Sequence, residues 1–335
     1  MICLGIESSC DETAVSIVED GRTVISNIVA SQIDIHKKFG GVVPEIASRQ
    51  HISHISYVVK EALDASGFTF KDIDYIGVTY GPGLVGALLV GVAYAKSLAY
   101  ALNIPIVPTH HIEGHIAANY LTYTDLEPEF MALVVSGGHS HLIHVKDYTE
   151  FEIIGKTRDD AVGEAFDKVA RTLGLGYPGG PEVSKMAKNG EPTYKLPKTK
   201  FGNYDFSFSG IKTSVINIAH KEGENLNVAN MCASFEKTVC EELVENTMEA
   251  MKEYELNKVV LAGGVAANNY LRDLLKSESE KNNFKCYIPD FKYCTDNAAM
   301  IASAAHYNYI NGYKYNIEEK LDLNAVANLQ IGEHK

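Results

Sequence analysis

The chain has 335 residues, more than one hydrophobic core usually holds, so we expect two domains or one fold built from two similar lobes. Hydrophobic residues make up 46% and charged residues 22%, which is typical of a globular enzyme and excludes a disordered chain. The net charge of −13 argues against strong nucleic-acid binding by the chain alone, because phosphate contacts dominate such binding.

Several features predict a cytoplasmic protein. The six cysteines form no CxxC pair, which favours free thiols in a reducing compartment. The N-terminus runs into a strand pattern without a basic leader, so we expect no signal peptide. The apolar run Leu84–Ala95 ends at Lys96 and is too short to span a bilayer. It predicts a buried helix, and we expect no membrane contact.

The first part of the chain, in order, shows apolar runs separated by polar turns. These runs predict strands at Ile2–Ile6, Thr13–Val18, Thr23–Ala30, Asp74–Thr79 and Ile104–Val107. Helices are expected at Pro44–Ala65, Leu84–Ala95 and His110–Tyr120. The first two strands form a hairpin whose tip, Glu7–Glu12, carries carboxylates and hydroxyls.

The same pattern then starts again. It predicts strands at Phe130–Val135, His141–Val145, Glu150–Gly155 and Lys258–Leu261, and helices at Gly163–Leu173, Val228–Tyr254 and Ala266–Leu275. Two such rounds indicate an internal duplication, with α/β layers and a mixed sheet in each lobe. Ligands of such folds bind beyond the strand ends, between the lobes.

A pair of histidines indicates a metal site. His111 and His115 are four residues apart, so on a helix both imidazoles can reach one ion, although either alone would more often be structural. Glu113 lies about 200° round the helix from His111, the wrong place for the base of a zincin protease. A third ligand must come from elsewhere. Thr295 or Asp296 could cap the Ala-rich helix that follows, and a capping carboxylate can leave one oxygen for a metal.

Glycine and serine turns after strands indicate phosphate binding. They occur at Ser8–Ser9, Ser136–Gly138 and Gly263–Gly264, where backbone amides can approach a phosphate closely. The chain has no P-loop and no Rossmann fingerprint, so the phosphates would be held another way. The helix start Asp159–Lys168 is acidic, which either matches the helix dipole or places Asp167 against a ribose hydroxyl.

These segments together resemble the TsaD family, known in archaea and eukaryotes as the kinase-associated endopeptidase-like proteins. The matching stretches follow the family order over nearly the whole chain: Gly5–Thr13, Gly40–Arg49, Gly81–Leu84, His110–His115, Val135–His139, Gly163–Lys168, Tyr177–Pro181, Phe206–Lys212 and Gly263–Asn268. The sequence of Gly40–Arg49 resembles that of the bacterial members of the family.

The resemblance implies a fold of the actin, sugar-kinase and Hsp70 type, with two RNase H-like lobes around a nucleotide cleft. The N-terminal lobe would comprise residues 1–125 and 297–330, and the C-terminal lobe residues 126–296. It also implies one divalent metal ion per subunit, Fe²⁺ or alternatively Zn²⁺, held by His111, His115 and Asp296.

The implied activity is that of a tRNA N6-adenosine threonylcarbamoyltransferase, an acyltransferase. It would move threonylcarbamoyl from threonylcarbamoyl-AMP to N6 of adenosine 37 in tRNAs that read ANN codons, forming t6A. The resemblance assigns the adenylate to the following residues: Val134, Val135, Ser136, Gly137, Gly138, Asp167, Gly180 and Asn268. Archaeal and eukaryotic relatives have a metal-contacting tyrosine where Val134 stands, so that contact is absent here.

Asp11 and Glu12 on the first hairpin tip are candidate catalytic residues, which would take the amine proton or position the adenine. The implied partners are tRNA and subunits resembling TsaB and TsaE, which would explain the acidic charge by sharing the tRNA contacts. Candidate tRNA contacts in this chain are Lys37, Lys38, Lys195, Lys198 and Lys200. Two alternatives stay open: a kinase or ATPase of the same fold, and a nucleotide-switched scaffold that docks partners through the Pro44–Ala65 helix.

Overall fold

The computed structural model describes residues 1–319 and 321–333. The chain divides into two compact units: unit 1 comprises Met1–Pro128, Asp147–Phe151 and Lys292–Lys335, and unit 2 comprises Glu129–Lys146 and Glu152–Phe291. Asp147–Phe151 and Asp296 both fall in unit 1. Asp296 therefore belongs to the same unit as His111 and His115.

Unit 1 contains a five-stranded mixed sheet in the order β3-β2-β1-β4-β5. Its strands are β1 (Ile2–Glu7), β2 (Glu12–Glu19), β3 (Thr23–Ser31), β4 (Tyr75–Gly81) and β5 (Ile106–His110). The first three strands pair antiparallel, whereas β4 pairs parallel with both β1 and β5. The carboxyl ends of β1, β4 and β5 therefore lie at one edge of the sheet.

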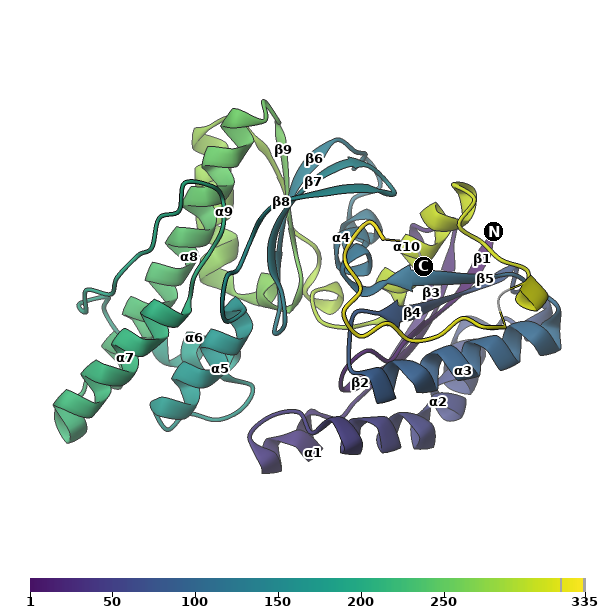
Figure 1. Ribbon diagram of the computed structural model, residues 1–335, viewed down its shortest axis with the longest axis horizontal. Coiled ribbons are helices and arrows are strands. Elements are labelled where there is room, and N and C mark those ends of the chain that lie inside the picture. The colour runs from purple at the N-terminus through teal and green to yellow at the C-terminus, as the bar shows by residue number, and fades with distance from the viewer. Residues whose placement is uncertain (320, 334–335) are drawn as a thin grey trace. The chain divides into compact units, whose positions relative to one another are not determined.

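Helices cover both faces of this sheet (Figure 1). They are α1 (Ile33–His36), α2 (Pro44–Ser66), α3 (Val85–Leu102), α4 (His111–Thr122) and α10 (Ala298–Ile310). Leu4 and Ile6 pack in the core under α2 and α3, whereas Cys3, which precedes Leu4 and faces the other side of the strand, packs with α10. This alternation follows from the two-residue period of a strand.

Two strand glycines allow α10 to lie directly on the sheet. A Cβ atom on Gly5 would come within 2.5 Å of the carbonyl oxygen of Ala298, and one on Gly77 within 2.5 Å of the Cβ of Ala305. Alanines on α10 face these glycines, so the helix and the sheet approach closely. This close packing fixes the start of α10, whose N-cap Asn297 directly follows Asp296 in the chain.

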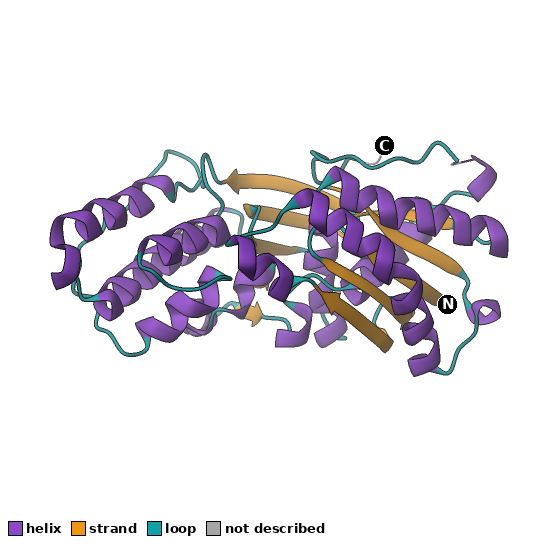
Figure 2. Cartoon of the chain, turned by 90° about the horizontal axis from the view of Figure 1, so that it is seen from below, coloured by secondary structure: helices purple, strands orange, loops and turns teal. Residues whose placement is uncertain are grey.

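Unit 2 repeats the design with the sheet order β10-β9-β6-β7-β8. Its strands are β6 (Phe130–Val135), β7 (Ser140–Asp147), β8 (Glu150–Lys156), β9 (Lys258–Ala262) and β10 (Lys285–Tyr287). Its helices are α5 (Val162–Thr172), α6 (Gly179–Ala187), α7 (Ser209–Glu222), α8 (Val228–Glu253) and α9 (Asn269–Lys281). Figure 2 shows helices and strands layered in this part as well. The repeated strand order confirms the predicted duplication.

Short 3₁₀ turns join several of these elements. They lie at Lys37–Phe39, Phe70–Asp72, Gly223–Asn225, Gly264–Ala267, Phe291–Tyr293 and Ile317–Glu319. The turn Gly264–Ala267 corrects one prediction: a helix was expected from Ala266, but α9 begins only after Asn268, whose side chain accepts a hydrogen bond from Leu271 N. Sequence patterns also missed α1, α6, α7 and β10, which are short or carry few apolar residues in a regular period.

The apolar helix α3 differs from its prediction. It continues beyond Lys96 to Leu102, and the Lys96 ammonium donates hydrogen bonds to the carbonyls of Leu321 and Leu323. Among the described residues it is the one helix long and apolar enough to span a bilayer by composition. It packs on β4 and α2, as a helix of a layered fold does, yet Val85, Leu89 and Tyr100 on its outer side are exposed.

Candidate metal centre and nucleotide-binding turns

The two histidines stand at the first turn of α4, directly after β5. His110 caps this helix, because its Nδ1 accepts a hydrogen bond from the backbone N–H of Ile112 at 3.1 Å. His111 and His115 follow one helical turn apart, with ring centroids 4.7 Å from each other. Both side chains are buried. The strand end and the cap therefore aim both imidazoles at the same place, as the spacing predicted.

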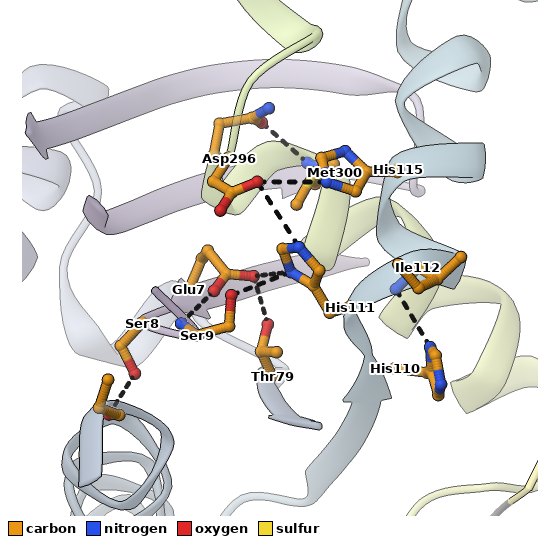
Figure 3. A network of polar contacts seen from close by, with 12 residues as sticks. Glu7, Ser8, Ser9, Thr79, His110, His111, Ile112, His115, Asp296 and Met300 are labelled. Atoms are coloured by element: carbon orange, nitrogen blue, oxygen red, sulfur yellow. Dashed lines mark hydrogen bonds and ion pairs between the residues drawn. The ribbon is translucent and has the colours of Figure 1, made fainter. Parts of the chain in front are cut away.

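Asp296 completes the group from the other end of the chain. Its Oδ1 lies 3.2 Å from His115 Nε2 and 3.6 Å from His111 Nε2 (Figure 3). One ligand atom from each of the three residues lies within 4.8 Å of the others. Neither ring nitrogen of His115 has a hydrogen bond within the part of the chain that the structure describes, although both are buried. A buried imidazole that makes no hydrogen bond with the described residues and lies 3.2 Å from a carboxylate oxygen fits a metal ion.

Glu7 supports His111 from the opposite side. Its Oε2 lies 3.0 Å from His111 Nδ1 and accepts a 2.7 Å hydrogen bond from Thr79 Oγ1. Ser9 Oγ also contacts His111 Nδ1, at 3.1 Å. A proton on Nδ1 that is donated to Glu7 leaves Nε2 free to face Asp296, which is the arrangement that metal-bound histidines show. Sequence reasoning had placed Glu7 only in a polar turn; its position at the end of a buried strand was the available signal.

Carboxylates give this site a strongly negative field. Burial would lower the pKa of His111, but Asp296 and Glu7 outweigh it and raise that pKa to about 9. Burial would raise the pKa of Glu7, and the charge of His111 lowers it below its usual range. Burial, and then the charge of Asp296, raises the pKa of Glu12 to about 10. A bound cation would offset this negative charge.

We expect Glu7→Gln to weaken metal affinity about 10-fold to 100-fold. In the wild type, Glu7 Oε1 accepts from Ser9 N, and Oε2 accepts from Thr79 and contacts His111 Nδ1. The glutamine amide has only one acceptor oxygen, so it cannot make all of these contacts. Chelator competition measures the affinity. Glu113→Gln is the matched control, because Glu113 is a buried glutamate on the helix that carries His111 and His115, but it lies outside the metal group. Equal affinity in both variants would show that Glu7 does not support His111.

Glu113 points away from the metal group. It is buried, and its Oε2 lies 3.5 Å from Asn308 Nδ2 on α10. It also lines a small cavity with Tyr120 and Tyr307. The geometry agrees with the helical argument that Glu113 is in the wrong place for a peptidase base.

The first hairpin places Asp11 and Glu12 beside this group. Asp11 follows Cys10 in the bend after β1 and is largely buried, and Glu12 begins β2 and accepts a hydrogen bond from Ser31. His51 on α2 braces the bend, with Nδ1 2.8 Å from Thr13 Oγ1 and Nε2 2.9 Å from the Cys10 carbonyl. The tip is thus held in a fixed conformation.

In unit 2, the turn after β6 packs against Gly163 on one side and Gly263 on the other. Val134 and Val135 are fully buried in the strand, so only their backbone can face a ligand, while Gly137 and Gly138 are exposed. A Cβ on Gly163 would come within 2.7 Å of Ser136 O, and one on Gly263 within 2.3 Å of Val135 O. Ser136 Oγ accepts the His139 N–H at 3.1 Å. This packing and this hydrogen bond hold the backbone of the turn in one conformation.

The remaining predicted residues of unit 2 stand on neighbouring elements. Asp167 on α5 accepts a 2.7 Å hydrogen bond from Gly179 N, next to Gly180 at the start of α6. Asn268 donates to Glu236 on α8 and to Ser184 on α6. Glu236 and Ser184 carried no sequence motif and were missed.

The proposed tRNA-contacting lysines are largely paired. Lys198 forms ion pairs with Glu241 and Glu245, and Lys200 with Glu249. Lys37 pairs with its neighbour Asp34. These pairs neutralise much of the positive charge that the sequence offered for phosphate contacts.

The two mixed sheets, each flanked by helices, define a protein of the actin, sugar-kinase and Hsp70 fold class, here with a His-His-Asp group in one unit. Full-length HypF, solved in its phosphate- and nucleotide-bound form, matches 93% of the chain with a TM-score of 0.63 and 16% identity; the chain spans 46% of HypF. Component A of (R)-2-hydroxyglutaryl-CoA dehydratase from Acidaminococcus fermentans matches 93% of this chain and 98% of its own, with a TM-score of 0.52 and 14% identity. Both show the fold alone.

Sequence comparison identifies the family. Residues 23–303 match the family described as TsaD: tRNA N6-adenosine threonylcarbamoyltransferase. Proteins named tRNA N6-adenosine threonylcarbamoyltransferase from Clostridium botulinum (strain Hall) and Clostridium kluyveri (strain ATCC 8527) are 57% and 56% identical, over 98% of this chain and 98% of each relative. The chain belongs to the TsaD family.

Proposed function

We propose that this protein transfers the threonylcarbamoyl group of threonylcarbamoyl-AMP to N6 of adenosine 37 in tRNAs that read ANN codons, forming t6A. The observation that carries the proposal is the His111, His115 and Asp296 group, built into a chain that belongs to this transferase family. Neither a kinase nor an ATPase reaction requires such a donor set.

The donor set fits one divalent ion. Two imidazoles and one carboxylate suit Fe²⁺ with open coordination positions, and they also suit Zn²⁺. Held by His111, His115 and Asp296, the ion would supply Lewis-acid polarisation of the carbamate carbonyl. Glu7 would orient His111 through Nδ1.

The chain's own residues would handle the amine proton. In the transfer, N6 of adenosine 37 bonds to the carbamate carbonyl carbon, the bond from that carbon to the phosphate oxygen breaks, and AMP leaves. The amine loses one proton, for which the carboxylates of Asp11 and Glu12 are the candidate acceptors or positioning groups. Their place on the hairpin that His51 holds in position supports this assignment.

The adenylate would bind to unit 2. Backbone amides of Gly137 and Gly138 would approach its phosphate, because no side chain lies over either glycine. Ser136 stays a predicted contact, although its own backbone N–H donates to the His139 carbonyl at 2.8 Å. Asp167 would face a ribose hydroxyl. The remaining predicted contacts are the following: Val134, Val135, Gly180 and Asn268.

The protein would act in the cytoplasm as the catalytic subunit of a multi-protein complex with TsaB-like and TsaE-like subunits. The net charge is −13, and Lys198 and Lys200 are already paired with glutamates. Both facts favour tRNA contacts that are shared with the partner subunits. Exposed apolar side chains on the outer sides of α2 and α3 support a partner surface there: Ile52, Tyr57, Val85, Leu89 and Tyr100.

We expect Asp11→Ala to lower threonylcarbamoyl transfer by about 100-fold or more, the range that a positioned acid or base contributes. Adenylate affinity should stay unchanged, because Asp11 is not among the residues proposed to bind the adenylate. Single-turnover rates and equilibrium binding measure the two quantities separately. Unimpaired turnover would remove Asp11 from the mechanism.

The direct test is transfer of labelled threonylcarbamoyl from pre-formed adenylate to an ANN-decoding tRNA, with partner subunits present. Label in tRNA with the wild type, but not with His111→Ala, supports the proposed reaction and makes the metal group essential. No label with the wild type, despite intact partners and adenylate, would favour the ATPase or the scaffold.

A further inference from the structure

Glu236 is a buried carboxylate within unit 2 that lies outside every predicted motif. It stands on α8 and is 7% exposed. Its Oε1 accepts a 2.6 Å hydrogen bond from Ser184 Oγ on α6 and a 2.7 Å hydrogen bond from Asn268 Nδ2. Burying such a polar side chain is costly unless donors surround it, so this arrangement indicates a specific role for Oε1 as a hydrogen-bond acceptor.

The Asn268 side chain is fully engaged by the protein. Its Nδ2 contacts both Glu236 Oε1 and Ser184 Oγ, the latter at 2.9 Å. Its Oδ1 accepts the Leu271 N–H at 2.9 Å and so caps α9. Any hydrogen bond that Nδ2 donates to a ligand would have to replace one of these bonds, whereas Oδ1 keeps a second lone pair.

The network ties together the elements that carry the nucleotide turns. Asn268 ends the segment that begins with Gly263, whose close approach to Val135 supports the turn after β6. Ser184 lies on α6, whose first residues are Gly179 and Gly180. A single acceptor on α8 therefore holds two of the elements that would contact the adenylate.

We propose that Glu236 is a positioning residue for the adenylate site, acting through Asn268 and Ser184. The inference rests on the proposed function of unit 2 in adenylate binding. In this role, Glu236 holds the start of α9 and helix α6 in fixed positions relative to each other.

The arrangement is tested by exchanging the hydrogen-bond donor at residue 268 and the acceptor at residue 236. The AMP affinity of each full-length variant is measured by calorimetric titration. Asn268→Asp keeps the helix cap but places a second carboxylate against Glu236. We expect AMP affinity to fall about 10-fold or more. Adding Glu236→Gln supplies an amide donor to the introduced carboxylate, and we expect affinity to return to within about 3-fold of wild type. Glu236→Gln alone should bind normally, since its carbonyl oxygen can replace Oε1.

Glu236→Ala provides a second measurement if Asn268→Asp fails to fold: it should lose about 10-fold in AMP affinity, whereas Glu236→Gln should not. A folded double variant that stays weak would overturn the inference, because it would show that restoring the donor–acceptor pair between residues 236 and 268 does not restore AMP binding. Unchanged affinity in both Asn268→Asp and Glu236→Ala would also overturn it. If wild type binds no AMP, the adenylate assignment itself fails, and the inference fails with it.

Discussion

The His115→Ala protein is expected to purify without its metal ion and to transfer threonylcarbamoyl more than about 100-fold more slowly than wild type, since loss of supporting residues alone costs 10-fold to 100-fold. His115 is buried, and its ring nitrogens find no hydrogen bond among the described residues. Replacing it by alanine therefore removes one of the three ligands and leaves only His111 and Asp296 to hold the ion. Elemental analysis of the purified protein measures occupancy, and a single-turnover assay measures transfer.

The matched control for that experiment is Glu113→Gln. Glu113 is buried on the same helix, two residues from His115, but its carboxylate contacts Asn308 instead of the metal group. The control protein should retain both metal and activity. Metal retained at wild-type level in His115→Ala would refute the three-residue site, and loss of metal in Glu113→Gln would show that the helix as a whole, not the ligand set, determines occupancy.

The second large effect concerns stability. Gly5→Val should lower the free energy of unfolding by about 3 kcal/mol, at the upper end of the usual cost of overpacking. A Cβ at Gly5 would come within 2.5 Å of the Ala298 carbonyl oxygen and 2.9 Å of the Ala302 Cβ, so α10 would have to move off the sheet. Urea denaturation of metal-free protein measures the change.

Gly210→Ala is the control for this stability experiment. Gly210 lies at the start of α7, and a Cβ there would meet no atom within 4 Å. Alanine suits a helix better than glycine, so this variant should be as stable as wild type or slightly more so. Equal destabilisation in both variants would mean that close packing of α10 is not the cause.

The sequence predicted the duplicated α/β fold because long apolar runs at regular periods mark strands and helices with little ambiguity. Elements without such runs were missed: α6 is short and begins with two glycines, and β10 has three residues. The start of α9 was placed too early, because a 3₁₀ turn and a helix share the same local composition, and only the Asn268 side-chain bond separates them.

For the candidate site, spacing along one helix was enough to pair His111 with His115. Asp296 was proposed from the family resemblance, since a helix cap and a metal ligand look alike in a sequence. Glu7 and Glu236 lie far along the chain from the residues they hold, and their contacts depend on tertiary packing. No local pattern marks such supporting residues, so they became visible only in the folded chain.

The discontinuity of unit 1 has a consequence for synthesis on the ribosome. Its sheet is formed by residues near the beginning of the chain, yet α10, which covers Gly5 and Gly77, comes from residues 298–310. Domains fold as the chain emerges from its N-terminus. Unit 2, which ends at Phe291, can be complete while the first sheet still lacks its covering helix. Because Asp296 emerges at that late stage too, the third ligand for an ion becomes available only when the last helix is ready to pack.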